Sequence, residues 1–260
     1  TPAYGVGVGN AVHVVDETAD LDDAANAIET AKTFDWATSC LADNAIVVSD
    51  SVYEPLLDRL VERGGHRCTA TEKAALRQRM WPEGSHIPTP EVIAKPAGMI
   101  AQLAGFDVAD DRTFLLVDED GVGQEHPFSG EKLSVVLAVY RYSGGIEQAV
   151  KLVNDITGYQ GLGHTCGIHT GSDEHVDALA AGTRTARVLV NQNLNEGAGS
   201  PRNGLPFTLS LSCGTWGGNI TTENVNARHF VNVTWVSRPI DAHPVGEEEL
   251  FVRHWARYGR

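Results

Sequence analysis

Short apolar runs alternate with longer segments of helical spacing along most of this chain, and this alternation limits the folds open to it. In the first unit, the apolar run 11–15 is followed by 20–32, where Leu21, Ala24 and Ile28 recur every three or four positions. Strands separated by helices favour an α/β fold with a mostly parallel sheet flanked by helices. Further expected strands are 45–48, 113–117, 133–140, 164–170, 186–190 and 229–236, and further expected helices are 51–62, most of 71–105, 145–156, 173–181 and 247–258.

Composition narrows the class of protein. The chain has 260 residues, 42% of them hydrophobic, which is enough for a large core and argues against disorder. Its formal charge is 20 minus 34, or −14, so we expect no nucleic-acid partner. No run of about 18 apolar residues is present, so we expect no membrane partner. Cysteines at 40, 68, 166 and 213 are widely spaced, which suits a reducing compartment, and we expect the cytoplasm.

Cys40 is the residue best placed for covalent chemistry. It ends a helical pattern and stands shortly before the apolar run 45–48. Catalytic groups often lie on loops held by a rigid scaffold, and a cysteine thiolate is strongly nucleophilic. A free cysteine is also commonly a small buried hydrophobic residue, so position alone leaves both interpretations open.

Two glycine-rich regions call for separate interpretations. The stretch 5–9 (GVGVG) comes before an expected strand, whereas a dinucleotide-binding fingerprint follows a strand and opens a helix. We therefore expect a tight turn there and no phosphate site. The region 191–226, rich in glycine, asparagine and serine, is expected to be a long ordered loop region that carries part of a functional site.

A cluster of His164, Cys166 and His169 contains zinc-type ligands. On a strand, His164 and Cys166 would share one face and His169 would point to the other, so the three would converge only around a bend. We expect no metal, and a metal-binding protein organised around these residues is the alternative. Glu131, just before the expected strand 133–140, either faces a ligand hydroxyl at the sheet edge or is a solvated loop residue.

Several stretches, in order, resemble the aldehyde dehydrogenases, and the CoA-acylating branch in particular. The stretch 18–22 (TADLD), followed by 32–35 (KTFD) and Cys40, is similar to the approach to the nucleophile in that family. Two stretches near the C-terminus, 203–207 and 247–259, resemble the acylating sulfoacetaldehyde dehydrogenases. The remaining similar stretches, which extend the resemblance over nearly the whole chain, are 131–134 (EKLS), 161–165 (GLGHT), 187–191 (RVLVN) and 213–219 (CGTWGGN) through 223–225.

This resemblance implies a role for each candidate residue. Cys40 would attack an aldehyde, the hydride would pass to NAD or NADP, and the acyl group would pass to CoA. Glu131 matches the family glutamate that holds the nicotinamide ribose. His164 matches a histidine that assists proton transfer, with a purely structural role still open. Hydrolytic relatives carry a glutamate base where this chain has 5–10 without a carboxylate, which favours transfer to CoA.

The resemblance also leads to expectations about substrate and organisation. Sulfoacetaldehyde is the favoured aldehyde, with Arg202, Asn203 and Arg228 as candidate ligands of its sulfonate, and succinate semialdehyde and acetaldehyde are alternatives. Family members carry a Rossmann cofactor domain before the segment where this chain starts, so the isolated chain is expected to bind NAD or NADP poorly and to turn over little. We expect a catalytic domain over 1–240, an oligomerisation or docking tail over 241–260, and a homo-oligomer.

Overall fold

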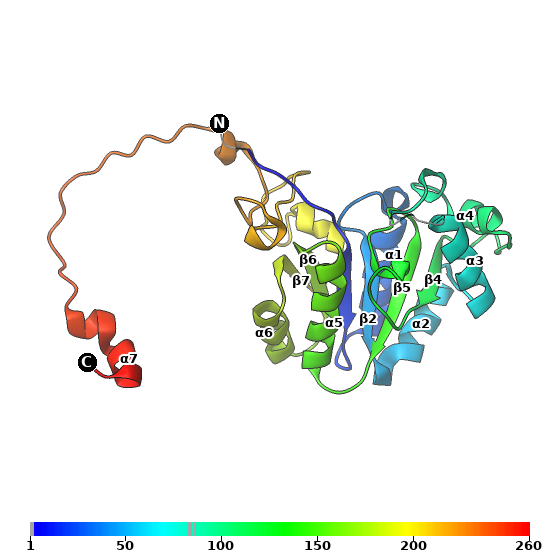
Figure 1. Cartoon of the computed structure of the whole chain (residues 1–260), viewed down its shortest axis with the longest axis horizontal. Helices are drawn as coiled ribbons and strands as arrows, with labels where there is room; N and C mark the ends of the chain where they lie inside the picture. The colour runs from blue at the N-terminus through cyan, green and yellow to red at the C-terminus, as the bar shows by residue number, and fades with distance from the viewer. Residues whose placement is uncertain (1–2, 83–84, 86) are drawn as a thin grey trace. The chain divides into compact units, whose positions relative to one another are not determined.

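Seven strands, all parallel, form a single sheet in the order β3-β4-β5-β2-β1-β6-β7 (Figure 1). The computed structural model describes residues 3–82, 85 and 87–260. The strands are β1 (Ala11–Val15), β2 (Asp43–Ser49), β3 (Gly65–Arg67), β4 (Phe114–Asp118), β5 (Val136–Tyr142), β6 (Gly163–His169) and β7 (Thr185–Val190). The α-helices are α1 (Leu21–Thr33), α2 (Tyr53–Glu62), α3 (Ala70–Met80), α4 (Ala97–Ala104), α5 (Ile146–Tyr159), α6 (Asp173–Gly182) and α7 (Glu247–Tyr258).

The ends of the helices follow from local chemistry. Before α1, the Asp20 carboxylate accepts hydrogen bonds from the backbone N–H groups of Asp22 and Asp23, which have no partner inside the helix. Before α3, Thr69 and Glu72 form a reciprocal capping box. These caps begin the two helices at positions that the sequence fixes locally.

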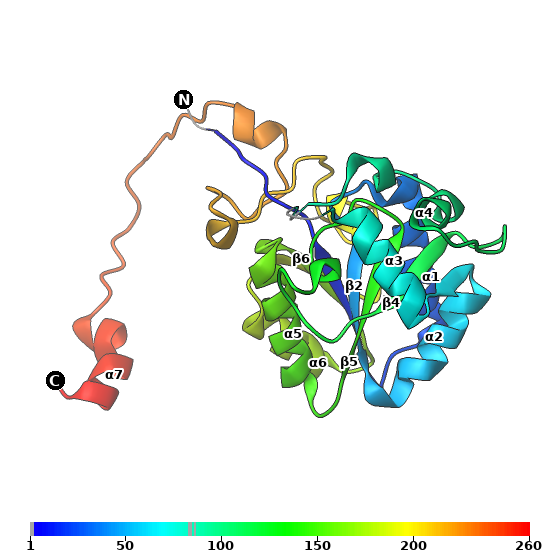
Figure 2. The same ribbon diagram turned by 45° about the vertical axis from the view of Figure 1, so that its right-hand side comes forward.

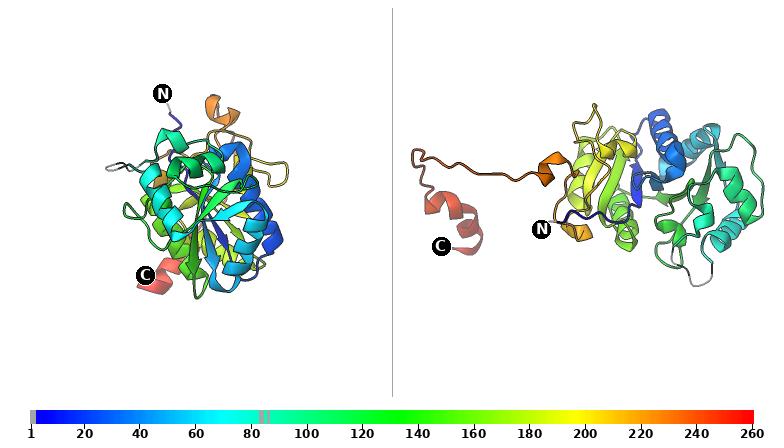
Figure 3. Two further views of the ribbon diagram at one scale, coloured as in Figure 1. Left: turned by 90° about the vertical axis from the view of Figure 1, so that its right-hand side faces the viewer. Right: turned by 90° about the horizontal axis from the view of Figure 1, so that it is seen from above.

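The helices cover both faces of the sheet. The connections β1-α1-β2 and β2-α2-β3 move along the sheet in one direction, whereas β5-α5-β6 and β6-α6-β7 move in the other. Because such crossovers are right-handed, α1 and α2 lie on one face and α5 and α6 on the opposite face (Figures 2 and 3). This arrangement explains why the central strands are buried along their whole length.

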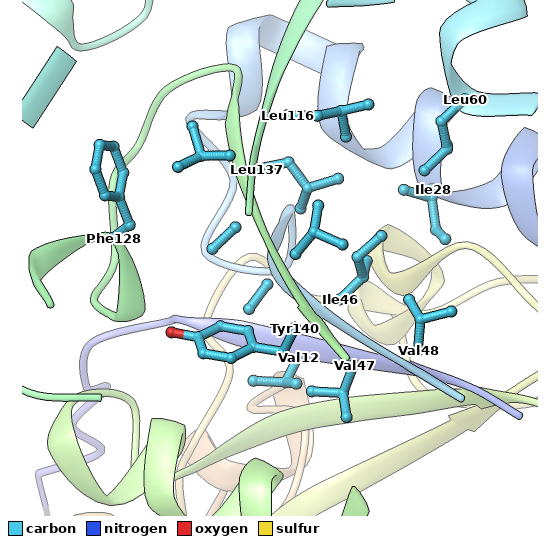
Figure 4. Packing of buried hydrophobic residues seen from close by; sticks show 14 of the residues in the cluster. Val12, Ile28, Ile46, Val47, Val48, Leu60, Leu116, Phe128, Leu137 and Tyr140 are labelled. Atoms are coloured by element: carbon cyan, nitrogen blue, oxygen red, sulfur yellow. The ribbon is translucent and has the colours of Figure 1, made fainter. Parts of the chain in front are cut away.

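The core fills both sides of the central strands (Figure 4). Ile46 on β2 lies on the same side as Ile28 of α1 and Leu60 of α2. Val47 points to the other side, where its register partner on β5 is Tyr140. All five side chains are at most 1% exposed. The tight double-sided burial makes the sheet a rigid support for the loops at its edges.

The expected parallel α/β fold is confirmed, with differences at particular segments. The short strand β3 follows the glycines that we expected only to stop a helix. The strand expected over 133–140 begins at Val136, because Leu133 adopts a left-handed conformation with φ of 46°. The expected strand 229–236 is wrong: a 3-10 turn occupies Ala227–Phe230, and no helix or strand follows it before α7. Within the helical region expected over 71–105, residues 83, 84 and 86 lie outside the described residues.

Residues up to 229 form one compact unit and residues 230–260 form a second, so this division falls before the boundary at residue 240 that we expected. The second unit contains α7, whose amphipathic sequence leaves Leu250, Phe251 and Tyr258 exposed within that unit. Among the helices of the described residues, none is long and apolar enough to cross a membrane.

Replacing Ile28 with alanine is expected to lower the free energy of unfolding by about 2–5 kcal/mol, because the side chain is fully buried between α1 and the sheet. Chemical denaturation followed by circular dichroism measures this change. The matched control is Thr30→Ala, on the exposed side of the same helix, with an expected change within about 0.5 kcal/mol. Equal effects of the two substitutions would contradict the assignment of the buried face.

Candidate active site

The residues singled out from the sequence meet at one edge of the sheet. Because all strands are parallel, the segments that precede them come together at the amino edge. Cys40 precedes β2, Glu131 precedes β5 and His164 is the second residue of β6. The parallel topology therefore brings together side chains that are up to 124 residues apart in sequence.

Cys40 lies on a turn with unusual backbone geometry. The 3-10 turn before it contains Asp35, Trp36 and Ala37, all in the left-handed region with φ of 48°, 53° and 58°. Non-glycine residues rarely adopt this conformation, and three in succession persist only where the surrounding structure holds them. The Ser39 hydroxyl accepts a hydrogen bond from the backbone N–H of Leu41, which tightens the turn around the half-buried cysteine.

The thiol of Cys40 faces the imidazole of His164. The distance from Sγ to Nε2 is 3.2 Å, and His164 is 1% exposed. Burial, then the negative charge of Glu131, raise the pKa of Cys40 to about 11. Burial and the charge of Arg187 lower the pKa of His164 to about 4. Near neutral pH the pair is thus a thiol beside a neutral imidazole, with Sγ and Nε2 at hydrogen-bond distance.

Glu131 is fixed on the other side of the N-terminal segment. Its Oε1 accepts a hydrogen bond of 2.9 Å from the backbone N–H of Gly9, and its own N–H donates to Oε1 of Gln160 at 2.9 Å. A Cβ at Gly9 would collide with both the carbonyl of Cys40 and the carboxylate of Glu131. Residues 3–10 therefore pass between the two candidate residues, and the tight turn expected over 5–9 is wrong: the glycines permit close approach of an irregular segment.

Buried polar side chains hold the Glu131 loop in place. The amide of Asn10 donates to the carbonyls of Ser129 and Gln160, both at 2.9 Å. The ammonium of Lys132 is fully buried and donates to the carbonyls of Phe128 and Gly130. Sequence reasoning missed these supports, although Lys132 lies inside the EKLS stretch that carried the resemblance.

Arg187 and Cys213 also belong to this edge and were missed as site residues. The guanidinium of Arg187 donates to the carbonyls of His164 and Ser212, at 3.1 and 2.7 Å. Burial raises the pKa of Cys213, while the N–H of Gly7 and the charge of Arg187 act against that rise. The two stretches RVLVN and CGTWGGN were the available signals.

A cavity of about 560 Å³ opens beside Cys40. The candidate sulfonate ligands do not line it. Arg202 lines a different cavity with His169, Asn203 donates to Gln192, and Arg228 pairs with Glu223. None of the described residues that line the Cys40 cavity is a lysine or an arginine. The lining residues are Phe34, Asp35, Thr38, Ser39, Cys40, Leu41, Asn195, Ala198, Thr208, Leu209 and Leu211.

The donor atoms of the proposed metal cluster do not converge. The His164 ring faces Cys40, the Cys166 thiol contacts the hydroxyl of Thr185 at 3.3 Å, and the His169 ring packs on His13 with centroids 4.7 Å apart. This arrangement contradicts the metal-binding alternative built on these three residues.

Two other groups of potential ligands lie close together. One consists of His66, Cys68 and Glu72, and the other of Glu119, Asp120 and His126. The Glu72 carboxylate already caps α3, and Glu119 already pairs with Lys73 at 3.3 Å and with His126 at 2.8 Å. Glu72 thus serves the start of α3, and Glu119 serves two ion pairs.

Comparison with known proteins identifies relatives of this chain. No protein-family model matches the chain. It is 43% identical over 263 aligned residues to an acylating sulfoacetaldehyde dehydrogenase of Cupriavidus necator and 39% identical over 266 to one of Bilophila wadsworthia. Both alignments cover 100% of this chain, and they cover 53% and 57% of the length of the two relatives, respectively. The chain thus spans about half the length of the curated relatives it matches.

A solved structure agrees with these sequence relatives. An acetylating aldehyde dehydrogenase from Geobacillus thermoglucosidasius superimposes with a TM-score of 0.87 at 33% identity, covering 94% of this chain and 54% of that one. Over its full length the chain is therefore similar to acylating aldehyde dehydrogenases, of which it spans about half.

Proposed function

We propose that this chain is the catalytic half of an NAD- or NADP-dependent, CoA-acylating aldehyde dehydrogenase in which Cys40 is the nucleophile. The observation that carries the proposal is the 3.2 Å contact between the Cys40 thiol and the neutral imidazole of His164, beside a cavity. A nucleophile next to a base at hydrogen-bond distance is the arrangement that covalent catalysis requires.

His164 serves first as the acceptor of the thiol proton. With that proton on Nε2, the Cys40 sulfur attacks the carbonyl carbon of the aldehyde, a C–S bond forms, and the carbonyl oxygen becomes an oxyanion. The backbone N–H of Cys40, which already favours the thiolate, is the proposed donor to that oxygen. A bound nicotinamide would supply a hydride acceptor for the same carbon, and loss of the hydride would leave a thioester on Cys40.

The site then releases the acyl group to CoA. The CoA thiol attacks the thioester carbon, the bond to Cys40 breaks, and the cysteine leaves as a thiolate that regains a proton. Residues 3–10 pass directly beside Cys40 and carry no carboxylate that could activate water. Their composition supports thiolysis over hydrolysis.

Glu131 fits the role of a cofactor-binding residue. Its carboxylate is anchored by the N–H of Gly9, and a carboxylate has several lone pairs, so acceptor capacity remains for a ribose hydroxyl. The carboxylate also lies across Gly9 from Cys40, so a cofactor held by it would lie close to the thiol. NAD and NADP share this ribose, so Glu131 supports either.

Sulfoacetaldehyde is the proposed substrate because relatives at 39–43% identity carry that name. One observation favours an uncharged aldehyde such as acetaldehyde instead: the described residues that line the Cys40 cavity include no lysine or arginine. A sulfonate bound there would be held by neutral donors such as Ser39, Thr38 and Asn195. Comparing kcat/KM for sulfoacetaldehyde, acetaldehyde and succinate semialdehyde in the complete enzyme decides between them.

We also propose that the second unit, 230–260, mediates assembly of several copies. Its support is the set of exposed apolar side chains on α7, which a partner surface would bury. Light scattering measures the number of copies per particle for the chain with and without residues 230–260. The same number of copies in both would contradict the proposal.

Alkylation of Cys40 by iodoacetamide is expected to accelerate about tenfold per pH unit between about pH 7 and 10, because only the thiolate reacts and its pKa is about 11. Peptide-resolved mass spectrometry measures the rate at each pH. Cys40→Ser is expected to remove this signal and to abolish acyl-enzyme formation, whereas Cys166→Ser changes neither. A rate plateau near pH 7 would contradict the raised pKa.

Replacing Glu131 with glutamine is expected to speed Cys40 alkylation at pH 8 by about two- to fivefold, because loss of a nearby negative charge lowers the thiol pKa. In the complete enzyme the same change is expected to raise KM for the nucleotide. The control for both measurements is Glu147→Gln, on the exposed side of α5. A slower alkylation would show that the carboxylate assists the thiol instead.

Replacing His164 with alanine in the complete enzyme is expected to lower kcat/KM by about 100-fold or more, the usual effect of losing a general base. The control is His175→Ala, since His175 pairs with Asp16 at the opposite edge of the sheet. Steady-state kinetics with aldehyde, nucleotide and CoA measures both variants. Normal turnover of the His164 variant would assign that histidine a structural role only.

A further inference from the structure

Arg187 on β7 is a buried cation without an anionic partner. The residue is 5% exposed, and the acceptors of its guanidinium are all neutral oxygens: Oδ1 of Asn224 at 2.7 Å, the carbonyls of Ser212 and His164, and the hydroxyl of Thr165 at 3.5 Å. Among the described residues, no carboxylate forms an ion pair with it, and the charges that act on it are those of Cys213 and Cys40. Buried arginines are ordinarily paired, because an uncompensated charge in the interior is costly.

The hydrogen bonds of Arg187 connect it to the candidate active site. One acceptor is the backbone of His164, whose ring faces Cys40, and another is the residue just before Cys213. A third acceptor, Asn224, belongs to the bridge that pairs it with Leu211. The guanidinium therefore joins the start of β6 to the loop that carries Cys213.

The field of this cation is not cancelled locally. Four neutral oxygens accept its hydrogen bonds but leave its positive charge in place. The ionisable groups whose charges act on Arg187 are the thiols of Cys213 and Cys40, and its charge in turn favours the thiolate of each. Glu131 acts on Cys40 with the opposite sign.

We propose that Arg187 is an electrostatic positioning residue, whose uncompensated buried charge stabilises negative charge on the sulfur of Cys40 while its hydrogen bond to the carbonyl of His164 fixes the facing imidazole. This inference rests on the proposed role of Cys40 and deepens it. The same charge disfavours an imidazolium at His164, so it helps to keep that ring neutral.

The positive charge of Arg187 offsets an electrostatic feature that parallel α/β folds share. Helices that connect parallel strands end at the amino edge of the sheet, so their partially negative C-termini point toward it. α1 ends at Thr33, shortly before Cys40, and α5 ends at Tyr159, shortly before His164. Helix dipoles therefore oppose a thiolate here, and a cation from β7 offsets them.

The test measures the pH profile of Cys40 alkylation in the chain itself. Arg187→Met removes the charge and keeps the apolar stem, so the apparent pKa is expected to rise and the rate at pH 8 to fall by about three- to tenfold. Arg187→Lys keeps a cation with fewer hydrogen bonds and is expected to restore most of the rate. A merely structural role would not separate these two variants by charge.

A second pair of variants leaves Arg187 in place. Asn224→Asp puts a carboxylate against the guanidinium and is expected to slow alkylation at pH 8, whereas Asn224→Ala loses the same amide bonds without adding charge and is expected to leave the profile unchanged. Circular dichroism confirms that each variant is folded. This pair tests the proposal even where Arg187→Met does not fold.

Folded Arg187→Met and Asn224→Asp chains with the parental pH profile would overturn the proposal, as would an equal shift in Asn224→Ala and Asn224→Asp. The acyl-enzyme assay with Cys40→Ser separates this result from the proposed function. If Cys40 is required but its profile does not respond to Arg187, only the positioning role fails. If the enzyme forms its thioester without Cys40, the proposed function fails.

Discussion

The common direction of the seven strands is the constraint on which the rest of the structure depends. Since every strand runs the same way, each loop that enters a strand opens at one edge, and the chain can gather Cys40, Glu131 and His164 there from three separate crossovers. The double-sided core holds these loops with little freedom. An antiparallel sheet of the same strands would distribute the three residues over two edges.

Close backbone contact is the second requirement of the site. The segment before β1 passes between Cys40 and Glu131 only because Gly9 has no side chain, and Gly163 similarly leaves no room for a Cβ beside the carbonyl of Cys213. Such contacts remove water from around the thiol, which contributes to its raised pKa. The thiol is therefore kept protonated until a base or a nearby positive charge favours ionisation.

Burial and charge act in opposite directions at this edge. Burial, Glu131 and the C-terminal ends of α1 and α5 all disfavour a thiolate, whereas Arg187 and the backbone N–H of Cys40 favour it. With a pKa raised to about 11, the thiol balanced in this way is almost fully protonated near neutral pH.

The sequence by itself determined the parallel α/β class and most helices and strands, because apolar periodicity and helix caps are local properties, and it singled out Cys40 because the matching stretches keep their order. It did not predict that 229–236 is irregular. The β-branched residues of this segment suggested a strand, but among the described residues no neighbouring strand pairs with it. Only the tertiary structure decided that Gly9 separates Cys40 from Glu131 and that Arg187 has no carboxylate partner among the described residues. These features depend on which loops meet across the sheet edge, and contacts between distant segments leave no periodic signal in a single sequence.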